Sequence, residues 1–113
     1  TLIIFCITLL TRGTNKANNL ISKNENELFE AIVSIDNIKE CKNFFYDLCT
    51  PSEINEFSTR WLIVRLLSKK IPYRQIATET GVSTTTVGRV ARYMKYGHNG
   101  YNSVLKNFYD KKN

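Results

Sequence analysis

The sequence predicts an all-α fold of about six helices. Apolar residues recur at helical spacing along most of the chain, and no stretch alternates apolar and polar residues as a half-buried strand does. Residues that favour helix caps and turns stand between these segments. At 113 residues the chain is the size of one domain, and it is small enough that a core shared with a second chain would help to stabilise it.

The first predicted helix covers residues 24–35. Its apolar face is formed by Leu28, Ile32 and Ile35. Acidic residues stand in the first turn of this helix, where negative charge is stabilised by the helix dipole.

A second helix is expected over residues 38–48, with Asp36 as its cap. Its apolar stripe contains Ile38, Cys41, Phe44, Phe45 and Leu48. We interpret the aromatic residues of this stripe as core rather than as a platform for stacked bases.

The third predicted helix has a strong start signal, "TPSE". Thr50 is expected to be the N-cap, Pro51 the first helical residue and Glu53 the second half of a capping box. The helix should run to about Lys69. Its middle, "WLIVRLL", is apolar nearly all round, so we expect both sides to face protein, one of them from another chain.

Residues 73–92 have the spacing of a helix-turn-helix, followed by a last short helix from Tyr101. The motif needs a small residue between the helices, a turn glycine and three apolar anchors, which here are Ala77, Gly81, Val82, Val87 and Val90. Ser83 is the expected cap of the second helix. The same spacing is also compatible with a helical corner that binds nothing.

The residues on the outer face of that second helix favour DNA binding over a helical corner that binds nothing. It carries Thr84, Thr85, Gly88, Arg89 and Arg92. Short hydroxyl residues allow close approach to a major groove, and a guanidinium bonds bidentately to guanine or phosphate. The expected backbone contacts on its flanks are Lys69, Lys70, Arg74 and Lys95.

The charge distribution supports an anionic polymer as partner. The net charge is +6, but residues 1–59 carry five Lys or Arg against eight Asp or Glu, whereas residues 60–113 carry eleven against two. The two parts therefore have charges of −3 and +9. A basic half of this kind is typical of a phosphate-binding surface.

The three cysteines and the single histidine predict neither a disulfide framework nor a metal site. We interpret the cysteines as reduced thiols of a cytoplasmic protein and expect no cofactor. Glu53 and Glu56 share a helix turn, but no nucleophile accompanies them, so an enzyme is not expected.

The first 23 residues combine a ten-residue apolar stretch with a polar, turn-rich one. The apolar part is too short to span a bilayer as a helix, and we do not expect membrane association. We interpret residues 1–23 as an extension outside the fold, with an arm docked on a partner subunit and an export signal as the alternatives. Residues 24–110 then form the helical DNA-binding domain.

From about residue 26 to 108 the sequence resembles the tryptophan-repressor superfamily, most closely its YerC/YecD-like branch. The stretches that carry the resemblance are "ECKNFFYDLCTPSEI", "TETGVSTTTVGRV" and "YMKYGHNGY". The resemblance implies an intertwined homodimer in which the N-terminal helices of two chains interlock and each subunit presents one helix-turn-helix.

The resemblance also implies a ligand pocket, since the tryptophan repressor holds its corepressor with residues that match Thr50, Arg60 and Arg89. A glycine and a serine of that pocket correspond to Val90 and Tyr93 here. We expect the larger side chains to fill the space for an indole, so that the pocket is vestigial. Thr50 would then act as a cap, and Arg60 would pair with an acidic residue.

These observations predict a homodimeric, sequence-specific transcription regulator, a repressor that binds double-stranded DNA without tryptophan. A helical assembly module with a basic face is the alternative. Because a related superfamily member is the DNA-binding domain of a bacterial replication initiator, a DNA binder outside transcription is another.

Overall fold

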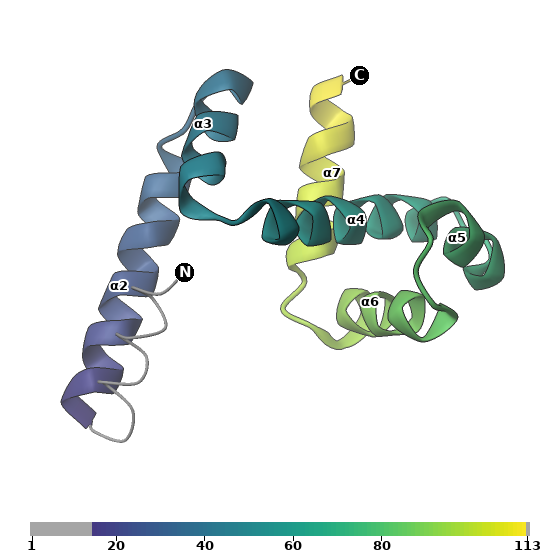
Figure 1. Cartoon of the computed structure of the whole chain (residues 1–113), viewed down its shortest axis with the longest axis horizontal. Coiled ribbons are helices and arrows are strands. Elements are labelled where there is room, and N and C mark those ends of the chain that lie inside the picture. The colour runs from purple at the N-terminus through teal and green to yellow at the C-terminus, as the bar shows by residue number, and fades with distance from the viewer. Residues whose placement is uncertain (1–14, 113) are drawn as a thin grey trace. The chain divides into compact units, whose positions relative to one another are not determined.

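The computed structural model describes residues 15–112, which form six α-helices and no strand. The helices are α2 (Asn15–Val33), α3 (Ile38–Leu48), α4 (Pro51–Ser68), α5 (Tyr73–Thr80), α6 (Thr84–Tyr96) and α7 (Gly100–Lys112), as Figure 1 shows. The predicted all-α class is confirmed. The chain divides into unit 1, up to Ile54, and unit 2, from Asn55 onward. The apolar stretch at residues 1–10 lies outside the described residues.

The first helix begins nine residues earlier than predicted, at residue 15 instead of 24. Ile21 is half-buried and stands seven residues before the half-buried Leu28, so the same apolar face continues toward the N-terminus. The polar residues between them lie on the exposed side. As a consequence the first turn contains no acidic residue, contrary to the prediction.

The cap of α3 is Asn37, whereas Asp36 was predicted. A capping side chain accepts from an amide three residues ahead, and Asn37 stands directly before the first helical residue. Its Oδ1 accepts from the backbone N–H of Glu40 at 2.8 Å. Asp36 supports the cap by accepting from Asn37 Nδ2 at 2.9 Å.

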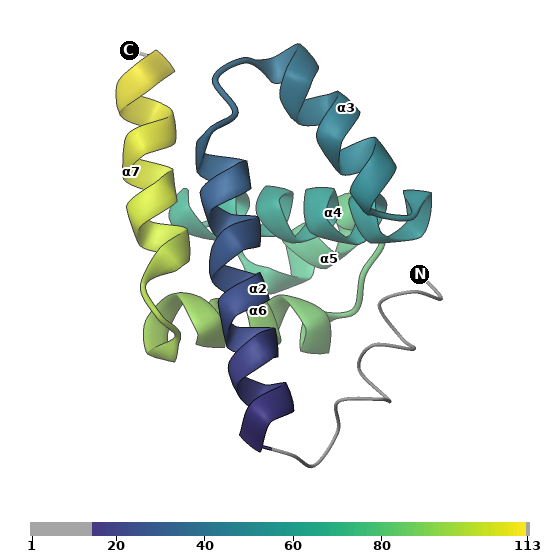
Figure 2. The same ribbon diagram turned by 90° about the vertical axis from the view of Figure 1, so that its left-hand side faces the viewer.

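Unit 1 has apolar faces but no buried residue among those described from 19 to 54. Residues 34–37 connect α2 to α3 (Figure 2). The rings of Phe44 and Phe45 meet edge to face at 5.6 Å, yet both stay half-buried. Val33 is 83% exposed and Ile38 is 77% exposed. Unit 1 therefore does not cover this apolar surface by itself.

The predicted capping box at the start of α4 is confirmed. The backbone N–H of Thr50 donates to Glu53 Oε1 at 2.9 Å, and that of Glu53 donates to Thr50 Oγ1 at 3.1 Å. The backbone and side-chain hydrogen bonds with Thr50 lower the pKa of Glu53. The cap therefore contributes stability above the usual pKa of a glutamate, and this contribution is lost as the pH falls through the lowered value.

The C-terminal end of α4 is a Schellman motif with a lysine in the left-handed position. Lys70 has φ 62°, its N–H donates to the carbonyl of Leu67 at 3.0 Å, and Ile71 N–H donates to that of Leu66 at 3.2 Å. Glycine usually occupies such a position because it has no Cβ. The bonds fix the backbone of Lys70 between α4 and α5.

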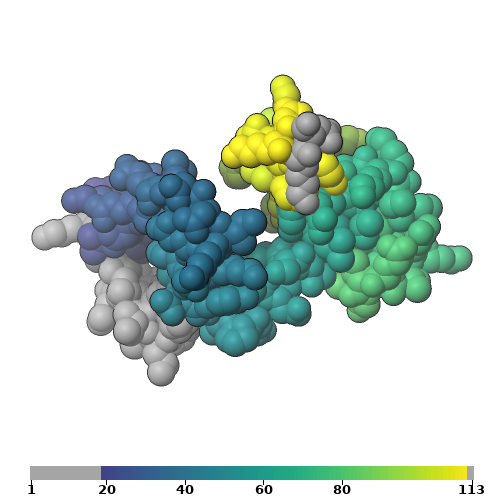
Figure 3. Space-filling view, turned by 90° about the horizontal axis from the view of Figure 1, so that it is seen from above, coloured from purple at the N-terminus to yellow at the C-terminus, as the bar shows by residue number. Residues whose placement is uncertain are grey.

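The core lies in unit 2, where four helices contribute buried side chains. The buried residues are Ile63, Val64, Ile76, Val87, Val90 and Leu105. Trp61 of α4 meets Phe108 of α7 edge to face at 5.7 Å, and Asn102 Nδ2 donates to the carbonyl of Met94 at 2.8 Å. These contacts hold α7, which is drawn in yellow in Figure 3, against α4 and α6.

The apolar stretch in the middle of α4 is covered largely by its own unit. Ile63 and Val64 are fully buried, and Trp61, Leu66 and Leu67 pack against the core. We predicted that a second chain would cover one side of this helix. The core of unit 2 already covers the apolar residues in its middle, so a second chain is not needed there. Of the ten large apolar residues that are exposed in the described part of the chain, five lie on α2 and α3, and one, Phe57, lies on α4. Across residues 15–112, no helix combines the length and the apolar character that crossing a bilayer requires.

Candidate nucleic-acid interface

The turn between α5 and α6 has the geometry that its sequence predicts. Gly81 adopts φ 77°, in the left-handed region, and its N–H donates to the carbonyl of Ala77 at 2.9 Å. Ser83 caps α6 by accepting from the N–H of Thr86 at 3.1 Å. A side chain at position 81 would be strained in this backbone, so the glycine sets where the second helix begins.

The inner face of α6 anchors the helix to the core. Val87 is fully buried and Val90 is 5% exposed, and Ala77 and Val82 pack against the same cluster. Four of the five residues predicted to build the helix-turn-helix thus meet around one core, and Gly81 forms the turn between the helices. The opposite face of α6 is left to solvent.

That opposite face is the recognition face, defined as Thr84, Thr85, Gly88, Arg89 and Arg92. All but Gly88 are exposed, and Gly88 is half-exposed. A Cβ built on Gly88 would meet nothing within 4 Å, so the middle of the face is open to a close partner. The structure brings these five residues together on one helix face, as the spacing predicted.

The predicted flanking cations are also exposed; they are Lys69, Lys70, Arg74 and Lys95. Within the described part of the chain none of them forms an ion pair. Glu79, the acidic residue nearest to them in sequence, accepts from Gln75 Nε2 at 3.1 Å instead. The ammonium of Lys95 lies 5.4 Å from the centre of the Tyr96 ring. The positive charge around α6 is therefore available to an external anion.

A hollow of about 440 Å³ lies beside α6, and we call it the arginine hollow. It is lined by Arg60, Thr86, Arg89, Val90, Tyr93 and Tyr101. Val90 is buried and Tyr93 is 67% exposed. Both side chains line the hollow, and their exclusion of an indole stays a prediction.

Two of the three residues matched to a ligand pocket line the arginine hollow, namely Arg60 and Arg89. As expected, Arg60 has an acidic partner, since its Nη2 lies 3.8 Å from Glu56 Oε2. Its guanidinium also lies 5.9 Å from the centre of the Phe57 ring. Thr50 belongs to unit 1, where it caps α4.

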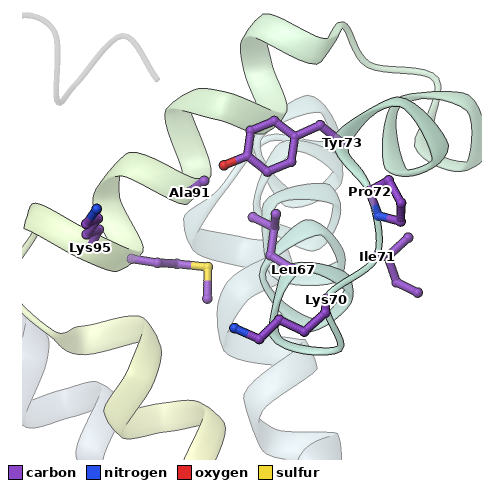
Figure 4. Close-up of a pocket in the computed structure, with 8 residues that line it drawn as sticks. Leu67, Lys70, Ile71, Pro72, Tyr73, Ala91 and Lys95 are labelled. Atoms are coloured by element: carbon purple, nitrogen blue, oxygen red, sulfur yellow. The ribbon is translucent and has the colours of Figure 1, made fainter.

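A second hollow, which was not predicted from the sequence, lies on the other flank of α6. This lysine hollow, about 450 Å³, is lined by Leu67, Lys70, Ile71, Pro72, Tyr73, Ala91, Met94 and Lys95 (Figure 4). Its residues come from two stretches of the chain, 67–73 and 91–95, that are brought together only by folding. Two of its residues, Lys70 and Lys95, were predicted solely as flanking cations.

The described cysteines carry no sign of catalysis. Cys41 and Cys49 are free and half-buried. Burial, and then the nearby charge of Glu53, raise the pKa of the Cys49 thiol, which disfavours the reactive thiolate. Among residues 15–112 no group of histidine, cysteine or acidic side chains is placed to hold a metal ion.

A glycine turn, two helices packed on a common core and an exposed face of hydroxyl and arginine residues define unit 2 as a helix-turn-helix module. Residues 23–108 match the family described as Trp repressor protein. The chain belongs to this family, which is one of DNA-binding regulators and not of enzymes.

Individual proteins similar to this chain are consistent with its membership of the family. The chain is 40% identical over 88 residues to the uncharacterized protein YerC of Bacillus subtilis, covering 78% of this chain and 85% of that protein. A TrpR-like protein from Eubacterium eligens has a TM-score of 0.74 at 37% identity, over 80% of this chain and 94% of its own. A proposed Trp repressor from Staphylococcus aureus has a TM-score of 0.73 at 34% identity, over 84% and 95%.

Proposed function

We propose that the chain is a sequence-specific transcription regulator of the cytoplasm, a repressor that occupies a palindromic DNA site as a homodimer. The observation that carries this proposal is the exposed recognition face on a helix whose other face is locked into the core. We further propose that residues 24–110 form the DNA-binding domain and that residues 1–23 lie outside it, although α2 begins at Asn15.

In this proposal α6 enters the major groove with its recognition face. Thr84 and Thr85 are short enough for close approach, and the open position at Gly88 keeps the middle of the face flat. Arg89 and Arg92 would donate to base edges, for which guanine offers two acceptors. The flanking cations would bind phosphates and fix the register.

The uncovered apolar surface of unit 1 supports a homodimer. No described residue from 19 to 54 is buried, although α2 and α3 carry large apolar side chains. Exposed large apolar side chains on two successive helices support a protein interface there. A second copy of unit 1 would offer complementary helices of the same length, and two reading heads would match two half-sites of a palindrome.

We expect dissociation and unfolding of the dimer to coincide, because unit 1 lacks a core of its own. The midpoint of thermal unfolding should therefore rise with protein concentration. Circular dichroism over a hundredfold concentration range, alongside analytical ultracentrifugation, measures both properties. A folded monomer at low micromolar concentration would contradict this expectation.

The direct test of the proposed function is selection of bound fragments from random duplex DNA, followed by binding assays at several salt concentrations. A regulator should enrich a two-fold symmetric sequence and bind it far more tightly than random duplex. Binding without sequence preference would indicate an architectural DNA binder. No binding by the folded protein at low salt would favour an assembly module that uses its basic face on an acidic protein.

We propose that the protein does not use tryptophan as a corepressor, and the support for this is Val90. Its branched side chain is held in the core at the wall of the arginine hollow, where the family's repressor has a glycine. Free tryptophan should bind weakly and leave DNA affinity unchanged. Titration calorimetry with and without DNA tests this, and Tyr93→Ser shows whether the rim residue contributes. Tight binding coupled to a gain in DNA affinity would restore the corepressor mechanism.

A further inference from the structure

The lysine hollow combines an apolar floor with a position beside the recognition face. The hollow is lined by apolar residues of α4 and the connection after it, Leu67 and Ile71, and by apolar residues of α6, Ala91 and Met94. Leu67, Ile71 and Met94 also pack against the core, so the floor is backed by the buried residues of unit 2. The hollow has a volume of about 450 Å³ and is open to solvent.

The rim of the lysine hollow is cationic. Lys70 and Tyr73 extend from the α4–α5 connection toward α6, which contributes Lys95 (Figure 4). The Schellman motif holds the backbone of Lys70 in the left-handed conformation, which fixes the origin of this side chain. Neither ammonium has a carboxylate partner among the described residues. A site with an apolar floor and two unpaired cations at its rim is complementary to an anion that has an apolar part.

We infer that the lysine hollow binds a small apolar carboxylate, an aryl or branched-chain acid. The apolar body would lie on Leu67 and Met94, where its removal from water is favourable. The carboxylate would accept hydrogen bonds from Lys70 and Lys95, which are strong because both partners are charged. Inorganic phosphate would pair with the cations but would leave the apolar floor exposed to water. A neutral apolar molecule would cover the floor but would leave the cations without an anion.

This site predicts an effector that opposes DNA binding, a consequence that rests on the proposed function. Lys70 and Lys95 are also proposed phosphate contacts, so a carboxylate bound to them competes with the DNA backbone. The coupling is reciprocal, and DNA should lower the affinity for the acid by the same factor. Occupation of the lysine hollow would thus release the protein from its site.

Titration of the full chain with phenylacetate, followed by calorimetry and by NMR in the absence of DNA, tests the site itself. Phenylacetamide and inorganic phosphate are the matched probes, because the first lacks the charge and the second lacks the apolar body. We expect phenylacetate to bind at least about tenfold more tightly than either. Equal binding of phosphate and phenylacetate, or no binding of phenylacetate and isocaproate, would overturn the inference.

Variants place the bound acid in the hollow. Ala91→Phe fills the space without changing charge and should abolish binding, with Ala91→Leu as the milder variant if the first is misfolded by circular dichroism. Lys70→Asn removes one cation, keeps a residue that tolerates the left-handed region, and should weaken binding about tenfold. Lys106→Asn, at an exposed lysine of α7 that does not line the hollow, should have no effect. Unchanged binding in properly folded Ala91→Phe would contradict the assignment.

The effect on DNA is measured separately on the selected duplex. Phenylacetate should weaken binding by the wild type and have less effect on Lys70→Asn. If the acid binds but DNA affinity does not change, the coupling is refuted and the site stands. If the acid binds and no duplex does, the proposed function fails instead.

Discussion

Replacing Arg89 or Arg92 by alanine is expected to cost about 1–3 kcal/mol of binding free energy on the best DNA site and to relax preference at one position in each half-site. Both side chains are exposed and unpaired within the described residues, so nothing in the chain competes for them. Because neither contributes to the core, the folded protein should keep its helical content. Competition assays on specific and random duplexes measure the loss.

Lys69→Ala and Lys95→Ala are the matched controls for this experiment. Because these lysines are proposed to bind phosphates, their replacement should weaken binding to every sequence alike and lower the salt slope by about one unit for each phosphate that is no longer bound. The contrast between the two classes separates base reading from general attraction. Equal, sequence-independent losses in all four variants would remove the claim that the arginines read bases, and would leave a nonspecific DNA binder.

Ile76→Ala is expected to destabilise the fold by about 2–5 kcal/mol, the range for truncating a fully buried isoleucine. Ile76 is 0% exposed and belongs to α5, which has one buried residue. Its loss leaves a cavity where α5 packs against α4 and α6. DNA binding should fall with the folded fraction, because the angle between the two helices depends on this contact. Chemical denaturation followed by circular dichroism measures the loss.

The conservative variant at the same position shows whether packing is the cause. Ile76→Val removes one methylene and should cost only about 0.5–1.5 kcal/mol. DNA affinity per folded molecule should then stay near that of the wild type. If Ile76→Ala were as stable as Ile76→Val, the view of α5 as anchored by this side chain would be incorrect.

The helices from α4 to α6 could be predicted because their signals are local. The capping box at Thr50, the turn at Gly81 and the cap at Ser83 each act within a few residues, and each is confirmed. The start of α2 could not, since it depends on one apolar residue, Ile21, that continues a face across a polar stretch. The choice between Asp36 and Asn37 as cap depended on which residue directly precedes the first helical residue, and the two candidates are adjacent in sequence.

The recognition face follows from helical periodicity, but the two hollows beside it do not. The size of Tyr93 can be read from the sequence, but the direction of its side chain, which also decides whether it fills a space, cannot. The lysine hollow depends on a left-handed lysine, for which the sequence contains no usual signal. Its lining also joins residues that are up to 28 positions apart, from Leu67 to Lys95.

Because position 88 is open, the residue there can change without affecting how the module folds. Glycine inside a helix is less stable than alanine by about 0.5–1 kcal/mol, and here no neighbour within 4 Å requires it. In the proposed complex with DNA, a residue other than glycine at position 88 would place its side chain next to the bases, while the scaffold becomes no less stable. Related proteins that differ at position 88 would then differ in the DNA site they bind without any compensating change in the core.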